Sequence, residues 1–135
     1  MHENNNVLER MKIVGQPVPG YEWLYNFYSF LDTAADGYCI INLDNDEEYI
    51  SDKICAAIGY TREQLGKTIE ELRRFVVAED FEFFAMQVRD LVGGKCQRIR
   101  TRKVLLCANG AQRRYNVTGT MHHGHVVTIW NEITQ

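Results

Sequence analysis

Residues 125–134 read HVVTIWNEIT, and this closing stretch decides the fold because it is apolar on both faces of an expected strand. With a period of two residues, Val127 and Ile129 point to one side of a sheet. Val126 and Trp130 point to the other side. A strand buried on both faces belongs in the middle of a sheet, whereas edge strands usually carry polar groups. We therefore expect the C-terminal segment to lie between earlier strands and to fix their order.

The composition is that of an ordinary globular protein. The 135 residues, with 45% hydrophobic and 24% charged side chains, suit a single domain. The net charge of -3 provides no positive field for nucleic acid or for an anionic membrane. No stretch approaches the roughly 20 apolar residues of a spanning helix, and residues 1–20 lack the apolar core of a secretion signal. We expect a cytoplasmic protein that binds neither nucleic acid nor a membrane.

The four cysteines are far apart in the sequence. No two of them form a C-x-x-C motif, which argues against a zinc knuckle and against a redox dithiol. Buried, reduced thiols are the ordinary interpretation of such cysteines. They are Cys39, Cys55, Cys96 and Cys107.

The N-terminal part divides into a linker and an aromatic helix. Residues 1–20 contain an Asn run and end in Pro-Val-Pro-Gly, so we expect a flexible linker there, in which Val7, Leu8, Met11 and Ile13 could form a short amphipathic turn. Residues 21–35 place apolar side chains at helical spacing and begin the single domain of residues 21–135. This helix has more aromatic groups than one contact face needs, so it either packs on the sheet alone or also meets a second copy of the chain. The expected dimer-interface residues are Trp23, Phe27, Phe30 and Leu31.

The rest of the chain indicates an α+β domain. Two short strands, 38–43 and 48–51, are followed by short helices that end near Gly59 and Gly66. Thr61 with Gln64 and Thr68 with Glu71 fit capping boxes at two helix starts, and a longer helix runs from Asp80 to Val92. Two longer strands flank Asn109-Gly110, a strong hairpin signal, before the closing strand. Strands, helices and strands in this order predict an antiparallel sheet with one face covered by helices.

The landmarks and their order resemble those of PAS domains over residues 32–134. They include Asp36-Gly37 before an apolar strand, Gly59-Tyr60-Thr61, Ala78-Glu79-Asp80 at the start of the long helix, Asn109-Gly110, and the terminal Glu132-Ile133-Thr134. The resemblance implies a five-stranded antiparallel sheet in the order 2-1-5-4-3. It also implies that any ligand lies between the helices and the inner sheet face. The pocket residues expected from it are Ile41, Ile58, Leu65, Leu72, Phe84, Val88, Leu91, Arg100, Tyr115, Thr128 and Trp130.

The resemblance implies a sensory or dimerisation module rather than an enzyme. In such proteins a signal passes through a homodimer to a covalently linked effector, for example the histidine kinase of a two-component system. The alternative is a ligand-free module for protein association. The identity of any cofactor stays open, although the helix at 68–75 lacks the cysteine of flavin photosensors and the helix at 80–92 lacks the histidine of heme sensors. No motif of a hydrolase, a phosphate-binding loop or a metalloprotease occurs.

Three arginines leave two alternatives open. Arg98, Arg100 and Arg102 share strand parity with the apolar Val104 and Leu106. Either a β-bulge near residue 103 swaps the faces and leaves the arginines in solvent, which we favour, or a guanidinium enters the pocket and binds an anionic ligand.

Two stretches resemble metal-binding motifs only superficially. Residues 44–55 lack the glycine and the bidentate carboxylate of a calcium loop. His122, His123 and His125 have no nearby cysteine or carboxylate, so we expect a solvated turn rather than a metal site.

Overall fold

The computed structural model describes residues 7–133, apart from the side chain of Ala34. In chain order the elements are α1 (Val7–Val14), α2 (Glu22–Ala34), β1 (Gly37–Asn42), β2 (Glu47–Ile50), α3 (Asp52–Ile58), α4 (Arg62–Leu65), the 3₁₀ helix η2 (Glu70–Phe75), α5 (Ala78–Val92), β3 (Ile99–Leu106), β4 (Gln112–His122) and β5 (His125–Glu132). Within the described residues, no helix has both the length and the apolar character needed to cross a membrane.

The strands form one five-stranded sheet in the order β2-β1-β5-β4-β3, in which every neighbouring pair is antiparallel. This confirms the expected topology and the central position of the last strand. Val127 of β5 lies opposite Ile40 of β1 on one side and opposite Thr120 of β4 on the other. The expected strand extended to Thr134, which lies outside the described residues, and β5 ends at Glu132.

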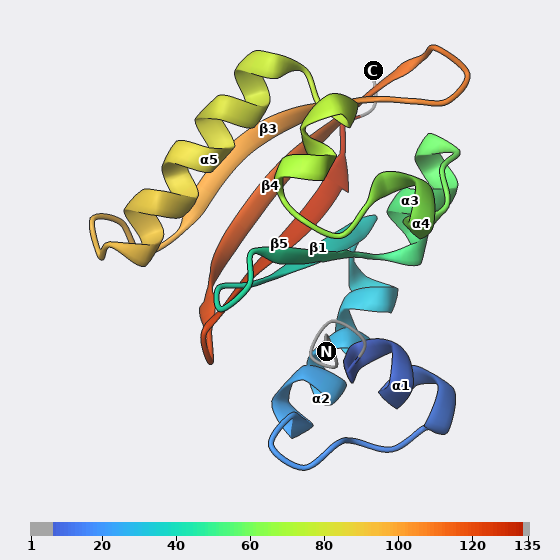
Figure 1. Cartoon of the computed structure of the whole chain (residues 1–135), viewed down its shortest axis with the longest axis vertical. Coiled ribbons are helices and arrows are strands. Elements are labelled where there is room, and N and C mark those ends of the chain that lie inside the picture. Colours follow the sequence, from blue (N-terminus) through green and yellow to red (C-terminus); the bar gives the residue numbers. More distant parts are fainter. Residues whose placement is uncertain (1–6, 134–135) are drawn as a thin grey trace.

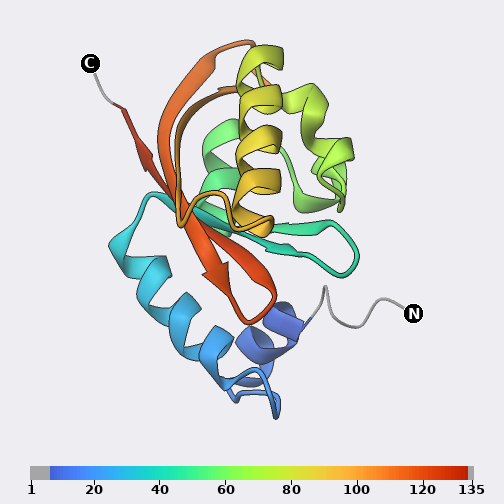
Figure 2. The ribbon, with the colours of Figure 1, turned by 90° about the vertical axis from the view of Figure 1, so that its left-hand side faces the viewer.

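Helices cover both faces of the sheet, not one. The helices α3, α4, η2 and α5 lie over one face, called here the inner face, while α1 and α2 lie on the opposite, outer face (Figures 1 and 2). On the outer face, Leu24 and Leu31 of α2 form a cluster with Tyr38, Ile40 and Val127 of the sheet. Alternate residues of β1 and β5 are apolar and point to the outer face. The helices α1 and α2 keep these side chains out of water.

The N-terminal segment differs from the linker expected over residues 1–20. Residues 7–14 form α1, in which Val7, Leu8 and Met11 are buried in the outer cluster. These three residues lie on one side of a helix at spacings of one, three and four, which is the spacing of an apolar helix face. Residues 1–6 lie outside the described part of the chain. The segment after α1 contains the two prolines and returns the chain to α2.

Local sequence signals fix the ends of the short helices. Gly59 has φ of 83°, a left-handed conformation suited to glycine, and its N–H donates to the carbonyl of Cys55 as α3 ends. Thr61 and Gln64 form a reciprocal capping box at the start of α4. Thr68 and Glu71 also bond reciprocally, since each backbone N–H donates to the other's side chain. These boundaries agree with the sequence-based expectations.

Strand β3 is regular, so the β-bulge expected near residue 103 is wrong. Its residues pair with β4 without interruption from Ile99↔Gly119 to Leu106↔Gln112. Regular alternation places Ile99, Lys103 and Leu105 on the inner face, and all three are buried. The basic residue that enters the interior is therefore Lys103, which is not among the expected pocket residues.

Candidate ligand-binding site

The inner face carries most of the expected pocket residues in two apolar clusters. The first cluster lies under α3, α4 and η2 and contains Ile58, Leu65, Leu72, Tyr115 and Trp130. The second cluster lies under α5 and contains Ile41, Phe84 and Leu91, with the half-buried Val88 packed against it. We call the packed interior between these helices and the inner sheet face the inner chamber.

Thr128 also lies on the inner face, and its hydroxyl is fully satisfied. Its Oγ1 donates to the carbonyl of Cys39 at 3.2 Å and accepts from the indole Nε1 of Trp130 at 2.9 Å. The Trp130 ring in turn packs edge-on against Tyr115, with ring centroids 5.5 Å apart. These contacts fix the orientation of the indole from the central strand.

Lys103 connects the two inner clusters. Its side chain is buried, and Nζ lies 3.4 Å from the ring centroid of Phe84 in one cluster and 4.7 Å from that of Trp130 in the other. Aromatic faces attract an ammonium group, and the attraction is larger where water is excluded. A cation therefore sits at the junction of two apolar clusters, a place where an uncompensated charge is costly.

Glu48 of β2 is the buried countercharge of Lys103. Burial raises the pKa of the Glu48 carboxyl, although the positive charge of Lys103 and a hydrogen bond with Cys39 both lower it. Burial also lowers the pKa of Lys103, against the opposing influence of Glu48, Cys39 and Asp80. Both shifts have the same cause, because desolvation disfavours the charged form of either group. We refer to Glu48 and Lys103 as the inner charged pair.

Arg100 does not belong to the chamber. Arg98, Arg100 and Arg102 are all exposed, on the side of β3 that faces away from the inner clusters. The expectation that the arginines are solvated is therefore right, but its explanation is not, since half-buried Val104 and Leu106 share that face. The second alternative, a guanidinium in the pocket, is wrong for all three arginines, and the basic residue buried on the inner face is Lys103. The parity of Lys103 with Ile99 and Leu105 was the available signal.

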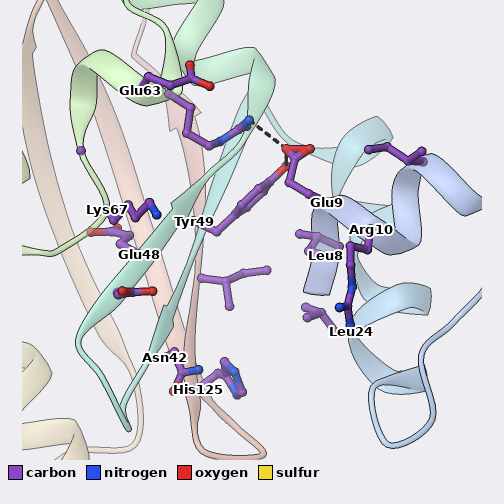
Figure 3. A pocket seen from close by; sticks show the side chains of 15 residues that line it. Leu8, Glu9, Arg10, Leu24, Asn42, Glu48, Tyr49, Glu63, Lys67 and His125 are labelled. Carbon is purple, nitrogen blue, oxygen red and sulfur yellow. Dashed lines mark hydrogen bonds and ion pairs between the residues drawn. The ribbon is translucent and has the colours of Figure 1, made fainter. Parts of the chain in front are cut away.

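A separate groove opens on the outer side of the sheet. It has a volume of about 610 Å³ and runs between α1 and the edge formed by β2 and α4. Figure 3 shows Leu8 and Glu9 of α1 facing Tyr49 of β2 across this groove. Its apolar floor includes Ile40, and His125 lines it as well. None of the expected pocket residues lines the groove.

Ion pairs join α1 to the rim of the groove. Arg62 of α4 contacts Glu9 at 2.9 Å and Asp52 at 2.6 Å. Lys12 of α1 contacts the hydroxyl of Tyr49 at 3.1 Å and Asp52 at 3.3 Å. Partial burial raises the pKa of Asp52, but the hydrogen bond from Arg62 and the charge of Lys12 outweigh it, so the pKa is lowered. Unlike the inner charged pair, these charges have direct partners.

The expected dimer residues of α2 separate into three environments. Leu31 is only 1% exposed and packs on its own sheet, which corrects its assignment to an interface with another chain. Trp23 and Phe27 are half-buried, and both rings contact His122 of the β4–β5 hairpin. Phe30 is 62% exposed. The interface itself stays a prediction, with Phe30 as its most accessible member.

The three histidines at this hairpin are not an isolated solvated turn. The Trp23 ring stacks on His123 with centroids 4.8 Å apart, and it also contacts His122 and His125. Phe27 meets His122 edge-on. Aromatic residues of α2 and the hairpin therefore pack together, and the helical spacing of Trp23 and Phe27 gave no indication of this partner. In the described part of the chain, no group of three or more His, Cys, Asp or Glu side chains could hold a metal ion.

Comparisons with known proteins identify the fold. No protein-family model matches the chain, and no curated protein matches it significantly. Among solved structures, a domain of the sensory box sensor histidine kinase/response regulator from Geobacter sulfurreducens is 21% identical, with a TM-score of 0.57 over 84% of this chain and 97% of that one. The PAS domain of the fruit-fly ELK potassium channel is 15% identical, with a TM-score of 0.60 over 83% and 98%.

A third structure is the LOV domain of a blue-light activated histidine kinase from Erythrobacter litoralis. It is 16% identical, with a TM-score of 0.54 over 73% of this chain and 96% of that one. The strand order and the inner-face helices described above agree with these similarities. The chain therefore has the PAS fold.

Proposed function

We propose that the chain is the sensory module of a signalling protein, binding a small molecule in the inner chamber and passing the signal to an effector such as a histidine kinase. The fold supports this proposal, because two of the similar structures come from histidine kinases. The observation that carries it is the inner charged pair, two ionisable side chains buried at the junction of the two inner clusters.

A closed core would gain nothing from this pair. Buried ion pairs are often no more stable than apolar residues of similar volume, since both charges lose their hydration. Ionisable groups with shifted pKa values in an interior are more frequent at functional sites than elsewhere. Glu48 and Lys103 come from opposite edges of the sheet, β2 and β3, so their meeting place is built by the whole sheet. Ligand recognition explains their presence without requiring catalysis.

The signal can leave the chamber through the elements that contact it. Phe84 and Leu91 of α5 pack on the inner face, and the central strand β5 places Val126 in that cluster and Val127 in the outer cluster under α2. A ligand that changes inner packing therefore acts on a strand whose other face supports α2. A homodimer formed through α2 would convert this change into a shift between two arrangements of the dimer.

A ligand-free association module is the alternative function. Exposed apolar side chains on the N-terminal helices favour it: Ile13 is 81% exposed, Val14 67% and Phe30 62%. Such groups gather at interfaces more than on ordinary surfaces. Phe30→Glu should convert a dimer to a monomer in analytical ultracentrifugation, with Phe83→Glu on α5 as the matched exposed control. An unchanged mass for Phe30→Glu would remove the interface from α2.

Native mass spectrometry of the freshly purified full chain tests the choice between the two functions. A sensor should carry a small-molecule adduct that disappears on denaturation, and Lys103→Met should reduce its occupancy. A chain that is free of adducts, and whose melting temperature no small molecule in a broad metabolite screen raises, would favour the association module.

A further inference from the structure

Lys103 is a buried cation with no hydrogen-bond acceptor. The residue is 4% exposed, and among residues 7–133 no hydrogen bond or ion pair joins its ammonium to another group, although Nζ is not one of the fully enclosed polar atoms without a partner, which are Tyr38 Oη, Glu47 Oε1 and Gln87 Oε1. A lysine ammonium has three N–H donors. The faces of Phe84 and Trp130 compensate part of its charge but accept no strong hydrogen bond. At least one position on this ammonium is therefore suited to an acceptor that the protein does not supply.

The charged and titratable groups around Lys103 do not fill this position. Glu48 attracts Lys103 electrostatically but does not reach ion-pair distance. Asp80 of α5 already accepts a hydrogen bond at Oδ2 from the N–H of Val104, at 2.8 Å. The Cys39 thiol is buried, and burial raises its pKa, so it stays protonated and is a weak acceptor.

The remaining surroundings define what kind of ligand fits. Apolar side chains of both inner clusters surround the ammonium, and the arginines of β3 face away from it. A single cation in an apolar site matches a single negative charge on a mainly apolar molecule. A second charge on the ligand would find no partner there, and burying it would be unfavourable.

We propose that Lys103 recognises the ligand of the inner chamber through a carboxylate, and that this ligand is a small monocarboxylic acid whose apolar body packs beside Phe84 and Trp130. This inference rests on the proposed sensory function and specifies its ligand class. The carboxylate oxygen accepts from the Lys103 ammonium, a charge-assisted hydrogen bond that is stronger where water is excluded.

Glu48 makes this recognition sensitive to pH. Its buried carboxyl has a raised pKa, so part of the titration range leaves it neutral while the acid in solution is ionised. A neutral Glu48 does not repel the bound carboxylate, whereas an ionised Glu48 does and competes for Lys103. Affinity for the acid should therefore fall as pH rises through the titration of Glu48. Cys39, Asp80 and Lys103 are the other titratable groups facing this position.

Isothermal titration calorimetry of the full chain with benzoate and hexanoate tests the proposal. Benzamide, hexanamide and hexylamine serve as matched neutral and cationic probes. The carboxylates should bind the native chain best, and in a pH series kept above the pKa of each acid their affinity should fall as pH rises. Lys103→Met should weaken their binding by about tenfold or more, and Glu48→Gln should remove most of the pH dependence. Arg100→Met, an exposed substitution on the same strand, should change neither.

The outcomes separate this inference from the proposed function. If the amides bind as well as the acids and Lys103→Met changes nothing, the chamber binds ligands but Lys103 does not select acids, and the inference is overturned. If no probe binds and the purified chain carries no adduct, the sensory function fails as well. A single ordered water on Lys103 that benzoate does not displace in a crystal structure would also overturn the inference. Circular dichroism of each variant shows whether it is folded.

Discussion

Helices cover both faces of the sheet, but the charged side chains on the two faces have different kinds of partner. On the outer side, Arg62 and Lys12 sit at the rim of a groove and contact Glu9 and Asp52 directly, at 2.6–3.3 Å. On the inner side, Lys103 is buried among apolar side chains and contacts aromatic rings instead of an acceptor. The outer ion pairs of Arg62 and Lys12 hold α1 in place, whereas the buried Lys103 ammonium has no ion-pair partner among the described residues.

This difference indicates which face of the sheet is the better candidate for a ligand-binding site. A groove of about 610 Å³ lies on the outer side, where Arg62 pairs with Glu9 and Asp52, although Glu47 Oε1, which also lines the groove, is buried without a hydrogen-bond partner. On the inner side, the Lys103 ammonium contacts two aromatic rings and no hydrogen-bond acceptor of the described residues. Unmet hydrogen-bonding capacity in a buried place is a stronger indication of a binding site than open volume, because it has a cost that a ligand removes.

The largest expected effect concerns the apolar contacts on each side. Phe84→Ala should lower the free energy of unfolding by about 3–5 kcal/mol, because it removes a fully buried ring from the inner cluster. Met11→Ala on the outer side removes a side chain that is 0% exposed and should cost about 2–5 kcal/mol locally. We expect α1 to detach before the sheet unfolds in this variant. Urea denaturation and hydrogen exchange measure the two effects.

The result for Met11→Ala tests whether the helices on the two faces of the sheet differ in how firmly they are held. If α1 and the sheet still exchange together in one cooperative unit, α1 is an integral layer of the domain and not a cover held by the outer face. Leu8→Ala provides a second truncation in the same helix.

The next effect concerns the inner charged pair. Replacing both residues, as Glu48→Leu with Lys103→Met, should keep or raise the stability by about 1–4 kcal/mol, since two desolvated charges are exchanged for apolar groups. The single variants should be less stable than the double variant, because each leaves one buried charge. Guanidinium denaturation measures all three. A double variant clearly less stable than the native chain would show that the pair serves the fold.

The pH dependence of stability should have opposite signs for the two sides. The folded pKa of Glu48 lies above its ordinary value of 4.5, so the folded chain binds more protons and its stability falls as pH rises from there through the folded pKa. The folded pKa of Asp52 lies below its ordinary 3.8, so its contribution is complete above that pH and is lost as pH falls through the folded pKa. Unfolding curves across pH measure both.

Matched amides identify the source of each slope. Glu48→Gln should flatten the decline at higher pH, and Asp52→Asn should flatten the loss at lower pH. If the stability of Glu48→Gln changes with pH in parallel with that of the native chain, a raised pKa of Glu48 does not cause the decline. Because Asp52 is largely exposed, its slope should also decrease at high salt.

The smallest expected effect is that of the outer ion pairs. Arg62→Met should lower stability by about 0.2–1 kcal/mol, the usual range for exposed pairs, even though its side chain is only 28% exposed. The loss should shrink as salt is added. A loss of several kcal/mol that salt does not affect would mean that Arg62 acts as a buried charge, like Lys103. The comparison of the two faces would then fail.

The topology could be predicted because it depends on local signals and on one central strand. The two-sided apolar pattern of Val126 to Trp130 placed β5 in mid-sheet, and the capping pairs Thr61 with Gln64 and Thr68 with Glu71 located the short helices. Hydrophobic periodicity and capping chemistry act over a few residues, so one sequence is enough to detect them.

The inner charged pair could not be predicted in the same way. Glu48 and Lys103 are far apart in the sequence, on the two edge strands, and only the completed sheet and α5 bring them into one interior. The apolar Val104 and Leu106 also made it hard to recognise which residues of β3 face inward, because hydrophobic residues on an outer face look like core residues in a sequence. The burial of α1 was missed because the neighbouring asparagine and proline residues suggested a linker.

Backbone amide NMR of the full chain, titrated with benzoate, tests the central claim most directly. The claim is that the sensing site is the inner chamber around Lys103, and not the outer groove. We expect saturable shifts at Lys103, Phe84 and Trp130 and none of comparable size at Leu8 and Glu9, with the inner shifts lost in Lys103→Met. Shifts confined to the α1 side of the sheet, or equal shifts in Lys103→Met, would contradict it.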